Sequence, residues 1–226
     1  MSFLFSLYRS DVGKKAVMAV TGIMLFGFVL VHMLGNLKLY LGPEKLNGYA
    51  HWLREVGSPV LPHSGLLWIA RLVLLGAVLL HVTAATQLTL KSLRARPQRY
   101  RQRVAIQSTY AARTARWSGL IIALYVVYHL AHLTWGYAHP SFVSGDVYGN
   151  VVAGFQIWWV SAVYMVAQVA LGVHLYHGLW SLFQSLGWWK PEGDGDWRRQ
   201  FALIFAWVVT LGNLSFPLAV MSGVVQ

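Results

Sequence analysis

The residues of this sequence with the clearest chemical potential are its histidines. The chain contains 9 histidines and no cysteine. His32, His81, His129 and His174 each lie deep within a different long apolar stretch. Ionisable side chains inside membrane-spanning helices are rare and usually functional. Neutral imidazole binds a metal through one ring nitrogen and leaves the other free to donate a hydrogen bond. The sequence therefore predicts a cofactor held by histidine.

The absence of cysteine narrows the choice of cofactor. It excludes disulfides, thiolate zinc sites, iron–sulfur clusters ligated by this chain and covalently attached c-type haem. Two further histidines, His132 and His177, each lie one helical turn from a deep histidine and share its face. Spacing alone therefore leaves either member of each pair open as a ligand.

Composition places these histidines in a membrane protein. The chain of 226 residues is 57% hydrophobic and 11% charged, whereas a soluble domain carries about 25% charged residues. A stretch of about 20 apolar residues spans the bilayer as a helix. We expect an all-α integral membrane protein, a bundle of five transmembrane helices within a single domain (1–226). Their expected ranges are 14–41, 64–90, 113–138, 155–186 and 199–222.

The net charge of +11 does not indicate nucleic-acid binding, because the basic residues lie between the apolar spans. All 18 Lys and Arg residues except Lys38, Lys45, Arg54 and Arg71 belong to connectors that meet on one side of the membrane. Cytoplasmic loops carry such an excess of positive charge. The sequence therefore predicts a cytoplasmic N-terminus and a C-terminus on the outside.

Depth within the helices sorts the four histidines into two levels. At a rise of 1.5 Å per residue, His32 and His129 lie about 15–16 Å from the outer ends of their helices. His81 and His174 lie about 27 and 30 Å from the outer ends of theirs. Two histidines from different helices at one depth can supply both axial ligands of a b-type haem, an arrangement suited to electron transfer. We therefore expect the bundle to enclose two haem b groups, about 12 Å apart in height.

The sequence resembles a known family along essentially its whole length. The family is the five-helix, di-haem cytochrome b (b558-type) membrane anchor of succinate:quinone oxidoreductases, which comprise succinate dehydrogenase and fumarate reductase. The residues that carry the resemblance are Gly13-Lys14-Lys15, Thr21-Gly22, Val31-His32-Met33-Leu34-Gly35-Asn36, Leu46-Asn47-Gly48-Tyr49-Ala50-His51-Trp52-Leu53 and His174-Leu175-Tyr176-His177-Gly178-Leu179-Trp180-Ser181.

The resemblance implies a role for each deep histidine. It implies that His32 and His129 ligate the iron of the outer (distal) haem, and that His81 and His174 ligate the iron of the inner (proximal) haem. It favours His129 over His132 and His174 over His177, where spacing leaves the choice open.

The resemblance also implies a component of respiratory complex II of the tricarboxylic acid cycle, in the bacterial inner (plasma) membrane. The chain would pass electrons between an iron–sulfur partner and quinone, either menaquinone or ubiquinone. A flavoprotein subunit and the iron–sulfur subunit would dock on the cytoplasmic face, and the succinate-oxidising site would lie outside this chain. The direction of the reaction and any higher oligomer of the whole complex stay open.

Polar residues near the helix ends are candidates for further contacts with the haems and with quinone. Haem propionates favour cationic or hydrogen-bonding partners. Arg116, Trp117 and Gln184 are candidates at the inner haem, and Arg71 at an outer propionate or a quinone oxygen. An outer quinone site is expected from His51, Trp52, Arg54 and Glu55, and an inner one from Tyr8, Lys15 and Arg116. Each quinone candidate is equally well explained as a surface or anchoring residue, whereas for Arg71 the alternative is a side chain that reaches to the membrane interface.

Two other function classes fit parts of the sequence. A transporter or channel would need polar residues along one path and helices broken near the middle of the membrane. Here the spans are continuous apart from Pro217. The second alternative is the di-haem cytochrome b subunit of another quinone-linked oxidoreductase, such as a nitrate reductase or hydrogenase. A haem spectrum tests the first alternative, and the partner that co-purifies tests the second.

Overall fold

The computed structural model describes residues 8–95, 110–188 and 196–226, with the side chains of 110–113 left out. All regular elements in those ranges are helices, and five of them are long and apolar enough to cross a membrane. They are α2 (Asp11–Asn36) with its extension η1 (Leu37–Leu41), α4 (Gly65–Arg94), α5 (Tyr110–His129) with the π-helical turn η2 (Leu130–Thr134), α7 (Trp158–Ser185) and α8 (Trp197–Met221). This confirms the predicted all-α fold with five membrane spans. The single-domain assignment stays a prediction.

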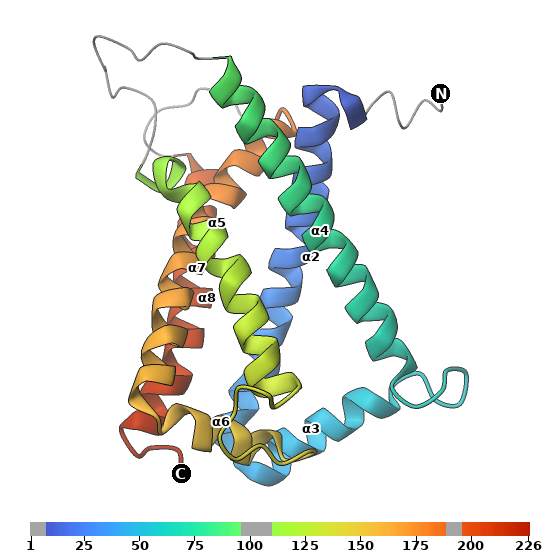
Figure 1. The fold of residues 1–226 in the computed structure, drawn as a ribbon, viewed down its shortest axis with the longest axis vertical. Coiled ribbons are helices and arrows are strands. Elements are labelled where there is room, and N and C mark those ends of the chain that lie inside the picture. The colour runs from blue at the N-terminus through green and yellow to red at the C-terminus, as the bar shows by residue number, and fades with distance from the viewer. Residues whose placement is uncertain (1–7, 96–109, 189–195) are drawn as a thin grey trace.

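Successive spans run in opposite directions, so the N- and C-termini lie at opposite ends of the molecule (Figure 1). The end that carries the C-terminus also carries two short helices, α3 (Pro43–Glu55) and α6 (Val147–Phe155). The five ranges expected from the sequence include no helix in either segment. Gly42 has φ 88°, which favours glycine, and Pro43 then starts α3 with a fixed φ. These two residues end the first span and begin a new helix.

Two predicted helix boundaries differ from the observed ones for local reasons. The fourth span was expected to begin at Phe155, but Ile157 has an extended backbone and separates α6 from α7. The Ser161 hydroxyl donates to the Phe155 carbonyl at 2.7 Å and satisfies the end of α6. The third span was expected to reach residue 138. It ends at Thr134, shortly before Gly136 with φ 78°.

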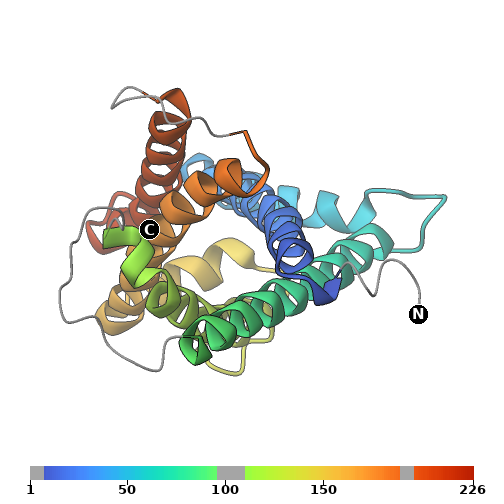
Figure 2. The same ribbon diagram turned by 90° about the horizontal axis from the view of Figure 1, so that it is seen from above.

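The spans pack as two groups. In the first, α2 lies against α4; in the second, α5 lies against α7, which also packs against α8. Figure 2 shows the two groups from above. Glycine permits close approach of helices: Gly172 of α7 faces the Thr210 side chain of α8. Gly212 of α8 faces Met33 of α2, which joins the two groups.

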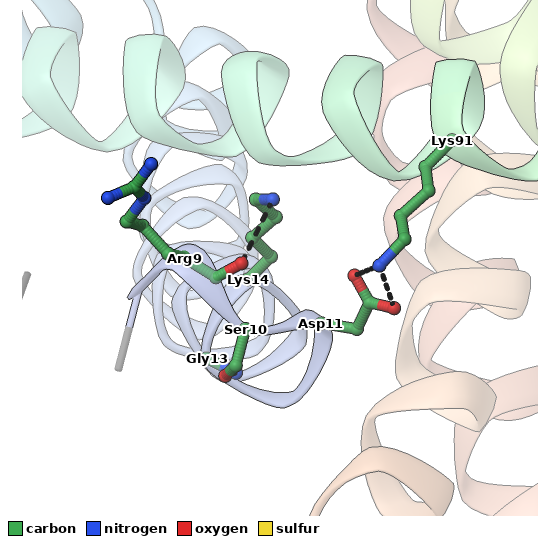
Figure 3. A network of polar contacts seen from close by, with 6 residues as sticks. All are labelled: Arg9, Ser10, Asp11, Gly13, Lys14 and Lys91. Carbon is green, nitrogen blue, oxygen red and sulfur yellow. Dashed lines mark hydrogen bonds and ion pairs between the residues drawn. The ribbon is translucent and has the colours of Figure 1, made fainter. Parts of the chain in front are cut away.

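Polar contacts tie α2 to α4 at the end that carries the N-terminus (Figure 3). Lys91 Nζ of α4 lies 2.8 and 2.7 Å from the two carboxylate oxygens of Asp11. Ser10 Oγ accepts a hydrogen bond from Gly13 N at 2.9 Å, which caps the start of α2. The predicted basic connectors fall largely in 96–109 and 189–195, outside the described residues.

Candidate functional site

The four deep histidines meet in the two pairs expected from depth. The His32 and His129 ring centroids are 6.0 Å apart with an interplanar angle of 82°. The His81 and His174 centroids are 6.4 Å apart at 65°. Imidazole nitrogen binds a transition metal at about 2 Å, so two rings on opposite sides of one metal ion have centroids about 6 Å apart. Both separations fit a shared axial metal.

A hydroxyl group lies within hydrogen-bond distance of Nδ1 of each histidine in the inner pair. Thr21 Oγ1 donates to the Val17 carbonyl at 2.7 Å and lies 3.1 Å from His81 Nδ1. Ser118 Oγ donates to the Ala115 carbonyl at 3.0 Å and lies 3.3 Å from His174 Nδ1.

A hydroxyl that gives its single hydrogen to the main-chain carbonyl can only accept from the histidine. In that arrangement Nδ1 of His81 and of His174 carries the proton. Nε2 of both rings is left with a lone pair that can bind a metal.

Glycine follows each of these hydroxyl residues and leaves room for the histidine ring. A Cβ on Gly22 would lie 3.6 Å from His81 Cε1, and a Cβ on Gly119 would lie 3.4 Å from His174 Cε1. Both distances are ordinary van der Waals contacts, so each glycine lets its helix lie directly against the histidine ring. The donor chemistry of the two rings, with Nε2 available, fits a haem iron held between two imidazoles.

One local pattern recurs in α2 and α5 that the sequence analysis did not identify. A hydroxyl residue and glycine precede a histidine by the same spacing, as Thr21-Gly22 before His32 and Ser118-Gly119 before His129. An aromatic ring stacks one turn before each histidine, Phe28 on His32 at 5.3 Å and Tyr125 near His129 at 5.7 Å. This repeat could have located Thr21 and Ser118 from the sequence.

His129 and His132 both reach the Tyr164 hydroxyl, but their other ring neighbours differ. His129 faces His32, whereas His132 is fully buried and stacks between Tyr128 at 5.5 Å and His139 at 4.8 Å. The helix changes from α to π directly after His129, which alters the angular step to His132. In the inner pair it is the His174 ring that faces His81, while His177 is half-buried one turn further on.

Tyr164 is a site residue that sequence reasoning missed. Its side chain is buried on α7, and its hydroxyl lies 3.3 Å from His129 Nδ1 and 3.0 Å from His132 Nδ1. Nothing in the spacing of α7 distinguishes it from a packing aromatic residue. Only the crossing of α7 with α5 brings it to the histidines.

The candidate propionate residues lie at the expected ends of the helices. Arg71 is exposed, with its guanidinium over the Trp68 ring at 4.9 Å, and lies about 15 Å along α4 from His81. Arg116 and Trp117 are exposed directly before Ser118 on α5, and Gln184 is exposed at the same end of α7. Their roles stay predictions.

The candidate outer quinone residues all lie on α3. His51 and Trp52 are exposed, and Trp52 stacks on Tyr49 at 5.7 Å. Arg54 donates to the Ala50 carbonyl at 2.6 Å, and Glu55 Oε1 lies 2.7 Å from His63 Nδ1.

The candidate inner residues lie at the opposite end of the molecule. The Tyr8 hydroxyl donates to Gln87 Oε1 at 3.3 Å, and Lys15 is exposed. A groove of about 440 Å³ between α5 and α7 contains none of the candidate quinone residues. It is lined by Tyr125, Tyr128 and aliphatic side chains.

Two carboxylates outside the spans have shifted pKa values. The Gly149 amide and the Asn47 side chain, both donating to Asp146, lower the pKa of that carboxyl below its ordinary value. The Arg198 side chain lowers the pKa of Asp196, which also accepts from the Arg198 amide at 3.0 Å and so caps α8. Both carboxylates stabilise helix starts.

Comparison with known proteins identifies one family. The model of the family described as succinate dehydrogenase/fumarate reductase transmembrane subunit matches residues 91–214, more than half of the chain. The matched range contains His129 and His174, while His32 and His81 precede it. No curated protein and no solved structure matches the chain.

Proposed function

Because the chain belongs to the succinate dehydrogenase/fumarate reductase transmembrane subunit family, we propose that it carries electrons between an iron–sulfur partner and membrane quinone through two b haems. The observation that carries this proposal is the presence of two histidine pairs, with ring centroids 6.0 and 6.4 Å apart. Each pair takes one ring from the α2–α4 group and one from the α5–α7 group. Each pair is thus spaced for the axial coordination of one haem iron.

In this proposal four histidines bind the haem irons, and two hydroxyl residues orient the ligands of one haem. His32 and His129 hold the distal haem, and His81 and His174 hold the proximal haem. Bound haem supplies one-electron transfer, and two histidine ligands fill both axial positions of its iron. Thr21 and Ser118 keep the proximal ligands in the tautomer that presents Nε2.

Family membership makes the chain part of a membrane complex with the other subunits of the enzyme. In the proposal, a flavoprotein and an iron–sulfur protein dock at the end that carries the N-terminus. Basic side chains gather at that end, as Lys14, Lys15, Lys91 and Arg94. The positive charge is expected on the cytoplasmic side of a bacterial plasma membrane, which leaves the C-terminus outside.

Quinone reduction takes up two electrons and two protons, so the quinone must lie near proton donors and near a haem. For an outer site we propose His51, Trp52 and Arg54 on α3, with Arg71 at a distal propionate or at a quinone oxygen. For an inner site we propose Tyr8, Lys15 and Arg116, which lie at the opposite end of the spans. Arg116, Trp117 and Gln184 are the proposed partners of the proximal propionates.

A di-haem cytochrome b subunit of another quinone-linked oxidoreductase would use the same histidine pairs. The family match over residues 91–214 favours the succinate dehydrogenase and fumarate reductase role over that alternative.

The deciding experiment is a reduced-minus-oxidised spectrum of the purified complex, with haem and chain quantified by pyridine haemochrome and amino-acid analysis. We expect two b haems per chain, reduced by succinate and reoxidised by quinone. Two haems that do not respond to succinate would assign the chain to another quinone-linked enzyme. A fully assembled complex without haem would refute the proposed ligands.

A further inference from the structure

One buried hydroxyl, that of Tyr164, lies within hydrogen-bond distance of both His129 at the end of α5 and His132 in η2. The Tyr164 hydroxyl lies 3.3 Å from His129 Nδ1 and 3.0 Å from His132 Nδ1. The Tyr164 ring is held by edge contacts with Phe155 at 4.8 Å and Tyr125 at 5.2 Å. Its side chain is only 4% exposed, so water has little access to compete for the hydroxyl.

One phenol hydrogen can serve only one acceptor, so at least one of the two histidines must donate to the Tyr164 oxygen. A hydroxyl group carries one hydrogen to donate and lone pairs to accept. If His129 presents Nε2 to an iron, its Nδ1 keeps the proton and donates to the Tyr164 oxygen. The Tyr164 hydrogen is then free to go to His132 Nδ1. The bonds run in one direction, from His129 through Tyr164 to His132.

Nε2 of His132 is a buried atom with no hydrogen-bond partner among the described residues in either tautomer, so the direction of the bonds rests on His129 and Tyr164. Gly154 packs directly against the Cε1–Nε2 edge of the His132 ring. A Cβ at this position would lie 2.7 Å from His132 Cε1 and 3.1 Å from Nε2. Neighbouring His139 is fixed as neutral, since its Nδ1 accepts from the Ser141 amide at 3.1 Å and its Nε2 donates to the Asn150 carbonyl at 2.9 Å.

We propose that Tyr164 is the positioning residue of the distal haem: it selects His129 as the ligand and holds His132 away from the iron. This inference rests on the proposed function. Tyr164 would act on His129 as Thr21 acts on His81 and Ser118 acts on His174, by accepting from Nδ1–H. In addition, the Tyr164 hydroxyl donates its own hydrogen to Nδ1 of His132, so this nitrogen is not available to the iron.

The hydrogen bond has an electronic consequence that a packing role would not have. An acceptor on Nδ1–H makes the imidazole a stronger donor to its metal and stabilises the oxidised iron. Loss of the acceptor should therefore raise the midpoint potential of the distal haem. The proximal haem, whose histidines have their own hydroxyl partners, should keep its potential.

The test is a redox titration of the purified complex carrying Tyr164→Phe, followed by optical and electron paramagnetic resonance spectra. We expect two haems per chain, with the potential and spectrum of one haem shifted and those of the other unchanged. Ser118→Ala should shift the haem that Tyr164→Phe leaves unchanged. Tyr128→Phe is the matched control, because it removes a buried tyrosine hydroxyl that has no hydrogen-bond partner among the residues that the structure describes, and it should shift neither haem.

A second pair of variants keeps the inference testable if Tyr164→Phe does not assemble. His132→Gln retains an acceptor for the Tyr164 hydroxyl and should keep both haems, whereas His129→Gln should lose one. The inference is overturned if Tyr164→Phe leaves both potentials at wild-type values, or if His132→Gln loses a haem. A wild-type complex without haem would instead refute the proposed function, so the two failures are distinguishable.

Discussion

At the scale of single residues, three of the four paired histidines have a hydroxyl group within hydrogen-bond distance of Nδ1. Thr21 and Ser118 sit one hydrogen bond away from the inner pair, on α2 and α5. Tyr164 occupies the corresponding place beside His129. These partners decide which ring nitrogen is free, and a metal can bind only the free one.

The Thr21 hydroxyl should tune the inner haem. Thr21→Val keeps the shape of the side chain but removes the acceptor for His81 Nδ1. One such bond contributes about 1 kcal/mol, which corresponds to about 40 mV for a one-electron couple. Because the bond persists in part with reduced iron, we expect the potential of the proximal haem to rise by no more than that amount in a redox titration.

Thr83→Val is the control for this change, because Thr83 is exposed on α4, half a turn from His81. It should leave both potentials at wild-type values. Equal shifts in both variants would mean that the Thr21 hydroxyl has no specific role at His81.

Depth along apolar spans was sufficient to predict which histidines meet, because helices of known rise cross the same membrane. It could not separate His129 from His132, since the π-helical turn that places them differently is not visible in the residue types. Tyr164 could not be predicted either. Its role depends on how α7 crosses α5, which no local pattern specifies.

At the scale of elements, the short helices α3 and α6 lie at the end of the molecule that carries the C-terminus and are joined by Asn47. The Asn47 amide donates to Asp146 Oδ1 at 2.9 Å, and its carbonyl oxygen accepts from the Tyr148 amide at 2.9 Å. One side chain of α3 therefore holds the first turn of α6.

Asn47→Ala should loosen both short helices without disturbing the spans. Two hydrogen bonds are lost, and we expect local stability to fall by about 1–3 kcal/mol. Hydrogen exchange followed by mass spectrometry should be faster in Pro43–Glu55 and Val147–Phe155. Lys45→Ala, an exposed change on the same helix, should leave exchange unchanged. Faster exchange throughout the spans as well would contradict a local role.

The start of α6 should also depend on pH through Asp146. Hydrogen bonds from the Gly149 amide and Asn47 lower the pKa of Asp146 below its ordinary value. The carboxylate therefore stabilises the fold at pH values above about 4. That stabilisation is lost as the pH falls through the lowered pKa, because the folded state must then take up a proton.

Asp146→Ala should cost about 1 kcal/mol at pH 7 as a lost helix cap. The gap between the variant and the wild type should close in acid, as measured by thermal unfolding followed through tryptophan fluorescence. Asp146→Asn is the matched control, since its stability should lack this pH dependence. A gap that stays constant from pH 7 to about 3 would rule out the carboxylate as its source.

At the scale of the whole molecule, the histidine pairs connect two helix groups. Gly212 against Met33 provides one direct contact between α8 and α2, and the ring pairs His32–His129 and His81–His174 lie between the groups. A haem bound by each pair would therefore cross-link the α2–α4 group to the α5–α7–α8 group.

Replacing either histidine of one pair should remove the same haem, although the two histidines lie on different helices. His81→Leu and His174→Leu should each remove the same haem, and the double variant should lose no more haem than either single variant. His32→Leu should remove the other haem. The check is the haem-to-chain ratio with low-temperature spectra of each variant. A double variant that loses both haems would show that His81 and His174 serve different sites.

The five spans were predictable because about 20 apolar residues are needed to cross a bilayer, and the sequence contains five such stretches. The helices α3 and α6 were not, since Pro43–Glu55 is short and polar, and Val147–Phe155 is continuous in hydropathy with α7. The break at Ile157 depends on the Ser161 side chain reaching the Phe155 carbonyl, which becomes visible only in the folded chain.

The recurrence of Thr21-Gly22 before His32 and Ser118-Gly119 before His129 gives the two helical hairpins equivalent positions. Each hydroxyl lies beside the histidine of its own hairpin, while each ring pair joins equivalent histidines of the two hairpins. That arrangement is what a dimer of one hairpin would have about a two-fold axis. This single chain thus places both histidine pairs where such a dimer would have its interface, with α8 outside the relation.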